Sequence, residues 1–425
     1  MLKLLCTADL HLGRRSSRVP DYLNGPAFSC AQTWLAMVDL ALRERVDLVL
    51  LGGDIIDLTN RFYESFGPLE KGLAALTEGG VKTFAVAGNH DYASLPDFRA
   101  AVSGLDFTLL GLEKGWESVV FTKGEEKLQI HGWSFAREHH RGNPMTEWSG
   151  EADPALPSIG LLHADLDGAG SGYAPLDQDD LARTGVGAWV VGHLHKPFLS
   201  RPGETPLVLV PGSPQAMDPG EAGVHGPWRL DIDQGRISAP TQIPLSTIRY
   251  EERKVDLDGT AREDELRSRL IKAVEDLRKK AGAESDRLEL ISCRLVLKGR
   301  TVLHGRLEAL TRELVDSLEL GSDRPLALVE KVRLRTRPAL DLQALAQSGG
   351  LAALLAGLIL DLESGRPSPE QDELIRKAVH KLSRIHSSGP YLNLDPGPPP
   401  GADAAREMIV RQGLLLLEEL MAQKD

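Results

Sequence analysis

Short apolar segments alternate with helical patterns through the first third of the chain. We expect strands at 2–8, 47–53 and 81–88, and helices between them at 27–46 and 69–79. Strands that alternate with helices indicate a parallel sheet covered on both faces. Such a sheet brings the carboxyl ends of its strands to one edge, where side chains distant in sequence converge.

A second group of apolar segments follows at closer spacing. These expected strands cover 128–133, 158–164, 188–193, 206–212 and 228–233. Their spacing leaves little room for intervening helices and predicts a second sheet packed on the first. The predicted fold class is therefore α/β, with a two-sheet α/β sandwich as the first domain, over residues 1–240.

The rest of the chain has a different pattern. Residues 241–340 combine helical patterns at 261–280 and 302–320 with two strands, SCRLVLKGR (292–300) and LVEKVRLRTR (328–337), which predicts a small α/β cap domain. Residues 341–425 contain three helical patterns separated by Pro- and Gly-rich segments and are predicted to form a helical C-terminal tail. The last helix, 403–423, follows the proline-rich run 395–400. It either packs on the helices at 351–386 or docks on a partner protein.

Charge and cysteine content limit the function classes. The net charge of −12 argues against a protein that coats nucleic acid through its overall charge, although residues 251–340 carry a net charge of +2. The three cysteines are scattered, which fits a reducing compartment and leaves His, Asp, Glu and Asn as metal ligands. The start turns polar too early for a signal peptide, and the longest apolar run (351–360) is about half of a ~20-residue membrane span. We therefore expect a cytoplasmic protein without membrane contact.

Five polar motifs stand where buried strands are expected to end. They are TADLHLG (7–13), GGDIID (52–57), AGNHD (87–91), LLHAD (161–165) and VGHLHKP (191–197). Each alone is more typical of a loop carboxylate beside a surface imidazole, or of a turn. Packing requirements do not produce all five together in this order, so the motifs predict one shared site.

The side chains of these motifs suit two divalent metal ions. Asp9 and His11 can reach one ion together, and Asp54 is a short carboxylate able to bridge two ions. The other candidate ligands are Asn89, His163, His193 and His195. Oxygen and nitrogen ligands without thiolate favour manganese, iron or zinc. Two ions about 3.5–4 Å apart would activate a bridging water for phosphoester hydrolysis.

His90 and Asp91 follow the candidate ligand Asn89 directly. The His90 side chain is expected to point away from the metals and toward substrate, where an imidazole can give a proton to the leaving oxygen. Asp91 is expected to orient this imidazole. Both residues are therefore candidate catalytic residues.

These motifs resemble the signature of the calcineurin-like metallophosphoesterases. TADLHLG, GGDIID and GHLHKP followed by PGSPQ are similar to the SbcD-type DNA double-strand-break repair nucleases, and GSPQAMDPGEAGVHG (212–226) is similar to their YhaO-like branch. For the first manganese-type ion, the resemblance implies the ligands Asp9, His11, Asp54 and His195. For the second ion, it implies Asp54, Asn89, His163 and His193. It also implies His90 as proton donor, action on double-stranded DNA ends and an SbcC-like coiled-coil ATPase as partner.

Two expected strands of the cap domain would each expose a basic face and bury an apolar one, because side chains of a strand alternate. Such faces can hold a duplex by its phosphates without reading its sequence. The basic residues concerned are Arg294, Lys298, Arg300, Lys331, Arg333, Arg335 and Arg337. Arg14 and Arg15, just past the first motif, are expected to meet phosphates near the metals. The alternative is an ordinary solvated surface.

The predicted function is a manganese-dependent DNA exonuclease and endonuclease. One alternative is a phosphodiesterase or phosphatase acting on a small molecule, which would have no use for a basic strand face. The other is a non-catalytic adaptor for an ATPase, which would not need the proton donor His90. The sequence leaves open the metal in vivo, the cleavage polarity and whether the protein forms a homodimer.

Overall fold

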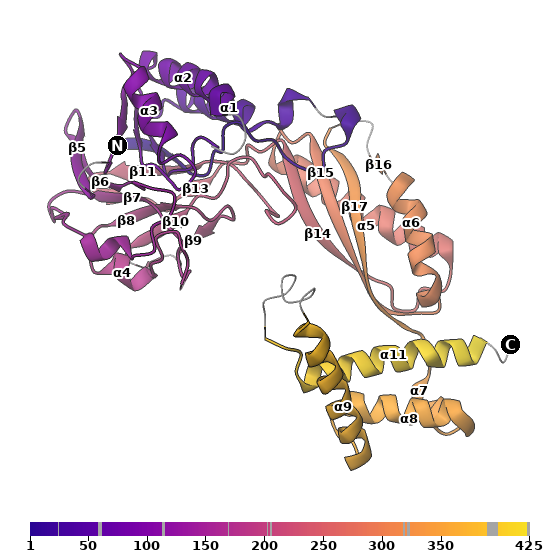
Figure 1. Cartoon of the computed structure of the whole chain (residues 1–425). Coiled ribbons are helices and arrows are strands. Elements are labelled where there is room, and N and C mark those ends of the chain that lie inside the picture. Colours follow the sequence, from indigo (N-terminus) through magenta and orange to yellow (C-terminus); the bar gives the residue numbers. More distant parts are fainter. Residues whose placement is uncertain are drawn as a thin grey trace. The chain divides into compact units, whose positions relative to one another are not determined.

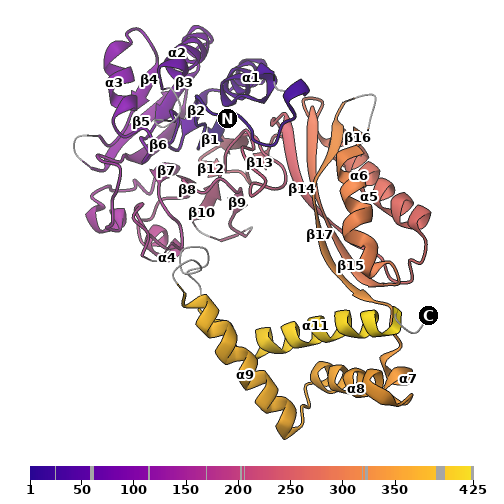
Figure 2. The same cartoon turned by 45° about the vertical axis from the view of Figure 1, so that its right-hand side comes forward.

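Four parallel strands form the centre of the first sheet. They are β1 (Leu2–Thr7), β2 (Leu48–Leu51), β3 (Lys82–Ala85) and β4 (Phe107–Leu109), adjacent in that order in a computed structural model of the chain. Figure 1 shows the chain, and Figure 2 labels these four strands. The connecting helices are α1 (Cys30–Arg43), α2 (Phe62–Glu78) and α3 (Ser94–Ala101). The α/β class predicted from the alternation of strands and helices is thereby confirmed.

The second sheet has six strands in the order β5-β6-β7-β8-β10-β9. They are β5 (Glu117–Lys123), β6 (Glu126–Trp133), β7 (Ser158–His163), β8 (Ala188–Gly192), β9 (Phe198–Leu199) and β10 (Leu207–Val210). Strands β6, β7, β8 and β10 are parallel, and one antiparallel strand flanks them on each side. The short helix α4 (Gln178–Ala182) precedes β8.

Strand β11 (Trp228–Asp233) belongs to the first sheet, where it pairs antiparallel with β1, so its expected place in the second sheet was wrong. The edge of β1 opposite β2 would otherwise leave backbone groups of a buried strand without partners. The segment 211–227 brings the chain back from β10 to fill this edge. Two short strands, β12 (Arg236–Ile237) and β13 (Thr241–Gln242), then pair with β11.

The two sheets share a core to which their strands contribute every second residue. Leu4 and Leu50 of the first sheet belong to one buried cluster with Leu161 of the second. The intervening residues, such as Val49, face the layer of α1 and α2, which contributes the buried Trp34. Because successive side chains alternate between the two faces, burial of one set fixes the orientation of each strand. The side chains just past the strand ends therefore have few possible directions.

A third sheet has the strand order β14-β15-β17-β16. Its strands are β14 (Ile248–Asp256), β15 (Leu290–Thr301), β16 (Glu319–Leu320) and β17 (Leu326–Pro338), and its helices are α5 (Glu263–Glu284) and α6 (Leu307–Ser317). The sequence indicated β15, β17 and both helices but not β14, whose polar stretch EERK has no apolar alternation.

The C-terminal helices are α7 (Leu342–Ala346), α8 (Gly350–Ser364), α9 (Pro369–His386) and α11 (Ala402–Ala422) (Figure 2). Leu414 and Leu417 of α11 are buried in one cluster with Ile359 of α8 and Ile375 of α9. The last helix therefore packs on its own chain, which is the first of the two alternatives. Residues 395–397 of the proline-rich run lie outside the described residues.

Contacts divide the chain into two compact units. The first comprises Met1–Glu252, Glu275–Cys293 and Glu319–Glu330, and the second comprises Arg253–Val274, Arg294–Leu318 and Lys331–Asp425.

The structure describes residues 1–23, 25–57, 62–112, 115–168, 170–201, 203–204, 206–317, 319–320, 324–388 and 398–422. None of the helices in these ranges is both long enough and apolar enough to cross a membrane. The division into three domains stays a prediction.

Candidate metal centre

The seven predicted ligands follow the carboxyl ends of five parallel strands. Asp9 and His11 come after β1, and Asp54 comes after β2. Asn89 follows β3, His163 ends β7, and the pair His193 and His195 follows β8. The strand ends of the two sheets meet at this site. The carbonyl of Gly52, after β2 of the first sheet, accepts a hydrogen bond at 2.9 Å from Nδ1 of His163, in β7 of the second sheet.

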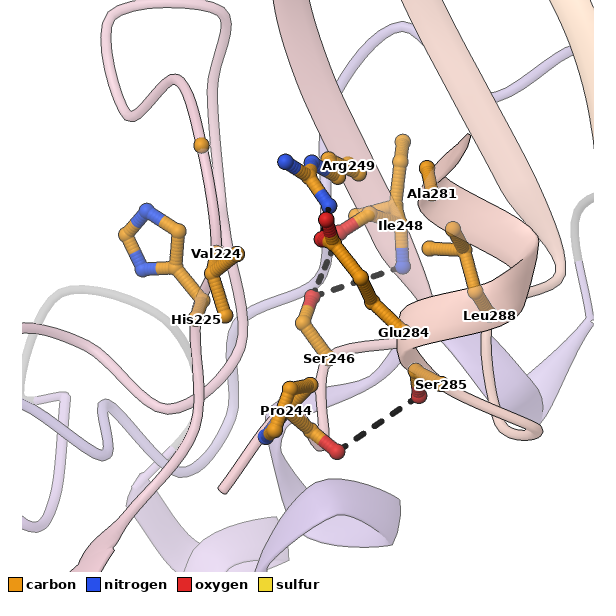
Figure 3. A pocket seen from close by; sticks show the side chains of 11 residues that line it. Val224, His225, Pro244, Ser246, Ile248, Arg249, Ala281, Glu284, Ser285 and Leu288 are labelled. Carbon is orange, nitrogen blue, oxygen red and sulfur yellow. Dashed lines mark hydrogen bonds and ion pairs between the residues drawn. The ribbon is translucent and has the colours of Figure 1, made fainter. Parts of the chain in front are cut away.

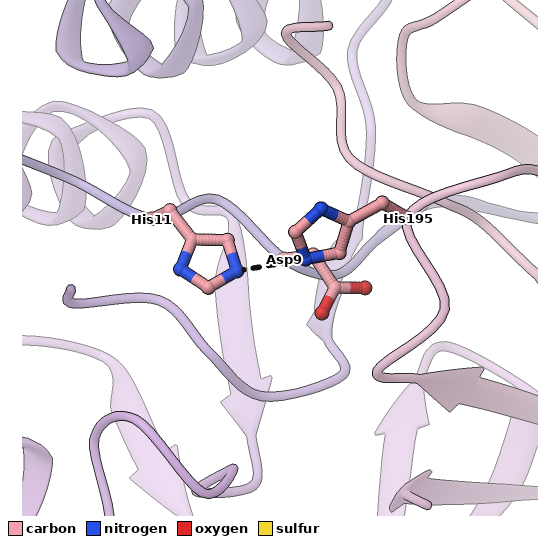
Figure 4. Close-up of side chains that lie close together, drawn as sticks. All are labelled: Asp9, His11 and His195. Carbon is pink, nitrogen blue, oxygen red and sulfur yellow. Dashed lines mark hydrogen bonds between the residues drawn. The ribbon is translucent and has the colours of Figure 1, made fainter. Parts of the chain in front are cut away.

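Asp9, His11 and His195 form the first group of converging side chains (Figure 4). The Nε2 atoms of the two imidazoles lie 3.1 Å apart. Asp9 and His11 are completely buried, and each of the three residues offers a ligand atom within 4.8 Å of the others. The two carboxylate oxygens of Asp9 also accept hydrogen bonds from the backbone of His193, at 3.1 and 3.2 Å.

Asp54, His163 and His193 form the second group. His163 Nε2 lies 3.1 Å from Asn89 Oδ1, which adds the amide oxygen to this group. Asp54 connects both groups, since its Oδ2 is 3.4 Å from His163 Nε2 and 3.8 Å from His11 Nε2. This is the position that a bridging carboxylate needs.

The residues present fit two divalent ions. Four imidazoles, two carboxylates and an amide oxygen gather in a largely buried site, and two imidazole nitrogens face each other at hydrogen-bond distance. Buried ionisable groups in such numbers are costly unless they are paired or coordinate a metal. Mixed nitrogen and oxygen ligation suits manganese, iron or zinc.

Burial shifts the pKa values in this cluster. It raises the pKa of the Asp9 carboxyl to about 6 and lowers the pKa of His11 to about 3 and that of His193 to about 4. Burial also opposes ionisation of His163, but the Asp54 carboxylate outweighs it and raises the His163 pKa to about 9. His11 and His193 are thus held in the neutral form that binds metal.

Backbone strain is concentrated at the same residues. Asp9, His11, Asp54 and His193 have φ values of 53°, 43°, 49° and 96°, a region that side chains other than glycine rarely adopt. Such strain persists where the surrounding structure enforces it and is typical of functional sites. Gly88 is needed for close approach, because a Cβ there would lie 2.2 Å from Asp54 Oδ1.

The buried carboxylate of Glu221, which the sequence analysis missed, contacts Nδ1 of His195, the ring nitrogen that does not face His11. Glu221 Oε1 lies 2.8 Å from His195 Nδ1, while Glu221 Oε2 accepts hydrogen bonds from Ser213 Oγ and the Met217 backbone, both at 2.8 Å. This contact fixes the ring so that Nε2 faces His11. The only sequence signal was the position of Glu221 in the motif GSPQAMDPGEAG.

Replacing Glu221 with Gln is expected to weaken metal binding roughly 10-fold, within the usual 10–100-fold range for carboxylates behind a ligating histidine. Gln keeps the volume but removes the charge that favours a ligating His195. Titration calorimetry with Mn²⁺ measures this. Glu204→Gln, an exposed carboxylate of the same unit, is the control. Equal affinity of both variants would contradict the role given to Glu221.

Asp57, not Asp91, faces the candidate proton donor. Asp57 Oδ1 lies 3.5 Å from His90 Nδ1, and this contact raises the pKa of His90. The Asp91 carboxylate instead accepts backbone hydrogen bonds from Gly88 at 2.7 Å and Ile55 at 2.6 Å. The expectation that Asp91 orients His90 is thus corrected: Asp91 ties two ligand loops together. Ligand atoms of His90, Asp57 and His11, one from each, also lie within 4.8 Å of one another, which makes these side chains a third group able to hold a metal ion.

The predicted DNA-binding residues are only partly available for phosphate. Arg14 contacts Asp57 at 3.4 Å and Lys298 contacts Asp256 at 3.4 Å, whereas Arg15 is exposed. Arg300 and Arg337 both contact Glu363. The ion pairs of Lys298, Arg300 and Arg337 lie at the surface and can exchange a carboxylate for a phosphate at small cost. Arg14 instead pairs with a buried carboxylate, so its release would leave the Asp57 charge buried without this partner.

The two basic strands differ. In β17, Lys331, Arg333, Arg335 and Arg337 are exposed and alternate with less exposed residues, as predicted. In β15, both faces of the strand are buried over residues 290–293 and 295–297, and Arg294 between them is half-buried. A basic face on β15 is therefore confined to Lys298 and Arg300.

A small pocket of about 20 Å³ elsewhere in the first unit has room for roughly one water molecule (Figure 3). Most of its polar side chains have partners: Arg249 pairs with Glu284, Ser246 Oγ donates to the carbonyl of Ile248, and Ser285 Oγ lies 3.5 Å from the carbonyl of Pro244. Nε2 of His225, which also lines the pocket, has no hydrogen-bond partner among the described residues. The volume is too small for a ligand larger than water.

Known proteins resemble the chain in two regions. Residues 2–197 match the family described as calcineurin-like phosphoesterase, and residues 250–337 match the middle domain of the metallophosphoesterase YhaO. YhaO of Bacillus subtilis is 29% identical over 310 residues, which cover 70% of this chain and 72% of YhaO. The DNA double-strand break repair protein Mre11 of Aeropyrum pernix is 27% identical over 270 residues, 55% of this chain and 64% of Mre11.

The fold also resembles a dimetal phosphatase from Danio rerio, with 13% identity and a TM-score of 0.36, covering 58% of this chain and 99% of that one. That score is too low to add to the argument. The sequence matches and the two ligand groups agree with each other, because the matched region 2–197 contains all seven candidate ligands. The chain thus resembles the calcineurin-like phosphoesterases over residues 2–197 and the metallophosphoesterase YhaO over 310 residues.

Proposed function

We propose that the protein is a manganese-dependent nuclease that hydrolyses phosphodiester bonds of DNA ends. The observation that carries the proposal is the position of Asp54 between two groups of ligands, 3.4 Å from His163 and 3.8 Å from His11. When bound, two ions there would supply charge stabilisation and an activated water. The similarity to Mre11, whose name describes a DNA double-strand break repair protein, supports DNA as substrate.

The chain's own residues then have separate tasks. His90 is a third exposed, whereas the ligands Asp9, His11 and His163 are fully buried, and it gives a proton to the leaving oxygen. Asp57 orients His90 and favours its protonated form, since their contact raises the His90 pKa. Asn89 would hold the second ion through its amide oxygen, which lies 3.1 Å from His163 Nε2, and Asp91 fixes the turn that carries both Asn89 and His90.

The basic face of β17 is proposed to hold the duplex. Lys331 and Arg335 are exposed, and neither forms an ion pair with any residue that the structure describes. Cations without a carboxylate partner are free to contact phosphates, which position a duplex without reading its sequence. A small-molecule phosphodiesterase has no need for such a face.

Reversing Lys331 and Arg335 to Glu is expected to weaken duplex binding and to reduce its salt dependence. Each lost phosphate contact removes about 0.9 from the slope of log affinity against log salt, so the two together remove roughly 2. Fluorescence anisotropy at several salt concentrations measures the slope. Reversing Arg267 and Lys272, two exposed cations of α5 in the same unit, is the control. A slope equal to that of the control would contradict the assignment.

The function itself is tested by manganese-dependent digestion of end-labelled linear duplex DNA, compared with an aryl phosphodiester and a panel of nucleotides. Shortening of the labelled strand is the expected result. Hydrolysis of the nucleotides or the aryl ester without digestion of the duplex would support a small-molecule phosphodiesterase. No hydrolysis of any substrate by metal-loaded protein would support the non-catalytic adaptor.

We also propose that the helices α8, α9 and α11 dock on an SbcC-like ATPase with a long coiled coil. Their own core is complete, yet large apolar side chains remain exposed on all three helices. These are Leu351, Leu354, Leu374, Ile385, Met408 and Leu416, between 40% and 74% exposed. Exposed apolar side chains in such density are typical of interaction surfaces.

Changing Leu351 and Leu354 to Glu is expected to abolish co-purification with the ATPase. Both residues lie on the same side of α8, away from the buried Ala352 and Ile359, so the helical core should remain folded. Hydrolysis of an aryl phosphodiester and the melting temperature should stay unchanged. Retained co-purification, with both controls unchanged, would exclude this surface.

A further inference from the structure

An open cavity of about 500 Å³ has no role in the chemistry described above. Its lining residues are Tyr92, Arg137, Glu138, His139 and Arg141. The volume lies within the usual range for small-ligand sites, about 300–1,000 Å³. Four of its residues come from the loop after β6, and Tyr92 comes from the turn after β3.

The loop after β6 is attached to the candidate metal centre at its start. The backbone of Phe135 donates to the carbonyl of Ala87 at 3.0 Å, and Ala87 donates in turn to Ser134 Oγ at 2.9 Å. Ala87 precedes the turn that carries Asn89 and His90. Arg137 therefore stands two residues after Phe135, whose backbone is hydrogen-bonded to the segment that leads into Asn89 and His90.

The same loop is also fixed from the other side. The backbone of His140 donates to Gly172 at 2.9 Å and accepts from Ala174 at 2.6 Å. The ring centres of His139 and Tyr173 are 5.2 Å apart, and those of Tyr173 and the candidate ligand His193 are also 5.2 Å apart. Two ring contacts thus join the cavity to the metal centre.

The cavity is cationic although the chain as a whole has a net charge of −12. Arg137 and Arg141 are exposed, and within the described part of the chain neither has an ion-pair partner. Glu138 is the one acidic side chain in the lining, and it faces His139 at 3.9 Å. Guanidinium groups match phosphate oxygens in a fork geometry, and an aromatic ring such as Tyr92 can stack on a nucleobase.

We propose that this cavity is a nucleotide subsite, which binds the phosphate and the base of the nucleotide next to the phosphodiester that is cleaved. The arginines hold the phosphate, and Tyr92 stacks on the base. The inference rests on the proposed nuclease activity, and it places the bound DNA strand along this cavity beside the metal centre.

The test compares two substrates of the manganese-loaded protein, a thymidine dinucleotide with a terminal phosphate and an aryl phosphodiester without a nucleoside. Changing Arg137 and Arg141 to Gln is expected to raise KM for the dinucleotide at least tenfold and to leave kcat unchanged. Turnover of the aryl ester should not change, which also shows that the variant folds. Arg99 and Arg236, exposed arginines of the same unit without an ion pair among the described residues, are changed to Gln as a matched control.

The outcomes separate this inference from the nuclease proposal. A dinucleotide KM equal to that of the control overturns the subsite, even where the wild-type protein digests duplex DNA. Failure of the wild-type protein to prefer the dinucleotide over the aryl ester also overturns it. A tenfold rise in the dinucleotide KM supports the subsite, even where the duplex is not digested and the nuclease proposal fails.

Discussion

Replacing Asp54 with Ala is expected to release both metal ions and to lower hydrolysis about a thousandfold or more. Asp54 Oδ2 lies between His163 and His11, so its loss removes a ligand from each group. Two ions contribute several kcal/mol of charge stabilisation in the transition state, and each 1.36 kcal/mol corresponds to tenfold in rate. Metal content by mass spectrometry and turnover of an aryl phosphodiester are the measurements.

Asp47→Ala is the matched control for Asp54. Asp47 is also a buried carboxylate, but it precedes β2 where Asp54 follows it, and it pairs with Lys123 and accepts from the Lys3 backbone. This variant should lose stability and keep both ions. Two tightly bound ions in Asp54→Ala would show that the bridge lies elsewhere.

Replacing His90 with Asn is expected to lower kcat by about 10²–10⁴-fold while both ions stay bound. General acid catalysis accounts for a factor of that size, and the proposal gives His90 the proton without coordination. Because the His90 side chain is a third exposed, the melting temperature should change little. Stopped assays with an aryl phosphodiester give kcat, and metal analysis gives the number of ions.

The comparison variant for His90 is His195→Asn. His195 contributes Nε2 to the first ligand group, so this variant should lose one metal equivalent. If His90→Asn also loses an ion, then the cluster of His90, Asp57 and His11 coordinates metal and another group must give the proton.

The sequence predicted the candidate ligands because their chemistry and their order depend on local pattern. A buried strand reads as an apolar run, and a polar motif directly after it must lie at the sheet edge. Asp9, Asp54 and His163 could be placed in this way, and the structure brings them to one site. The two-sheet fold followed for the same reason, since strand period and spacing are local properties.

Contacts between distant segments could not be predicted in that way. Glu221 is 26 residues from His195, and Asp57 is 33 residues before His90, so neither spacing carries a signal. Asp91 is next to His90 in sequence, yet its carboxylate turns to the backbone of Ile55. The turn directs successive side chains to opposite sides, and adjacency therefore misled the assignment.

The amino-acid sequence by itself determined the α/β class, the strand ends that carry chemistry and the donor types for two ions. The tertiary structure alone decided that β11 completes the first sheet, that α11 packs on α8 and α9, and that Asp57 faces His90. The physical reason is that periodicity and residue type act within a few residues. Partner choice instead depends on which backbone edges and side chains remain unpaired once the sheets have formed, and the sequence pattern does not contain that information.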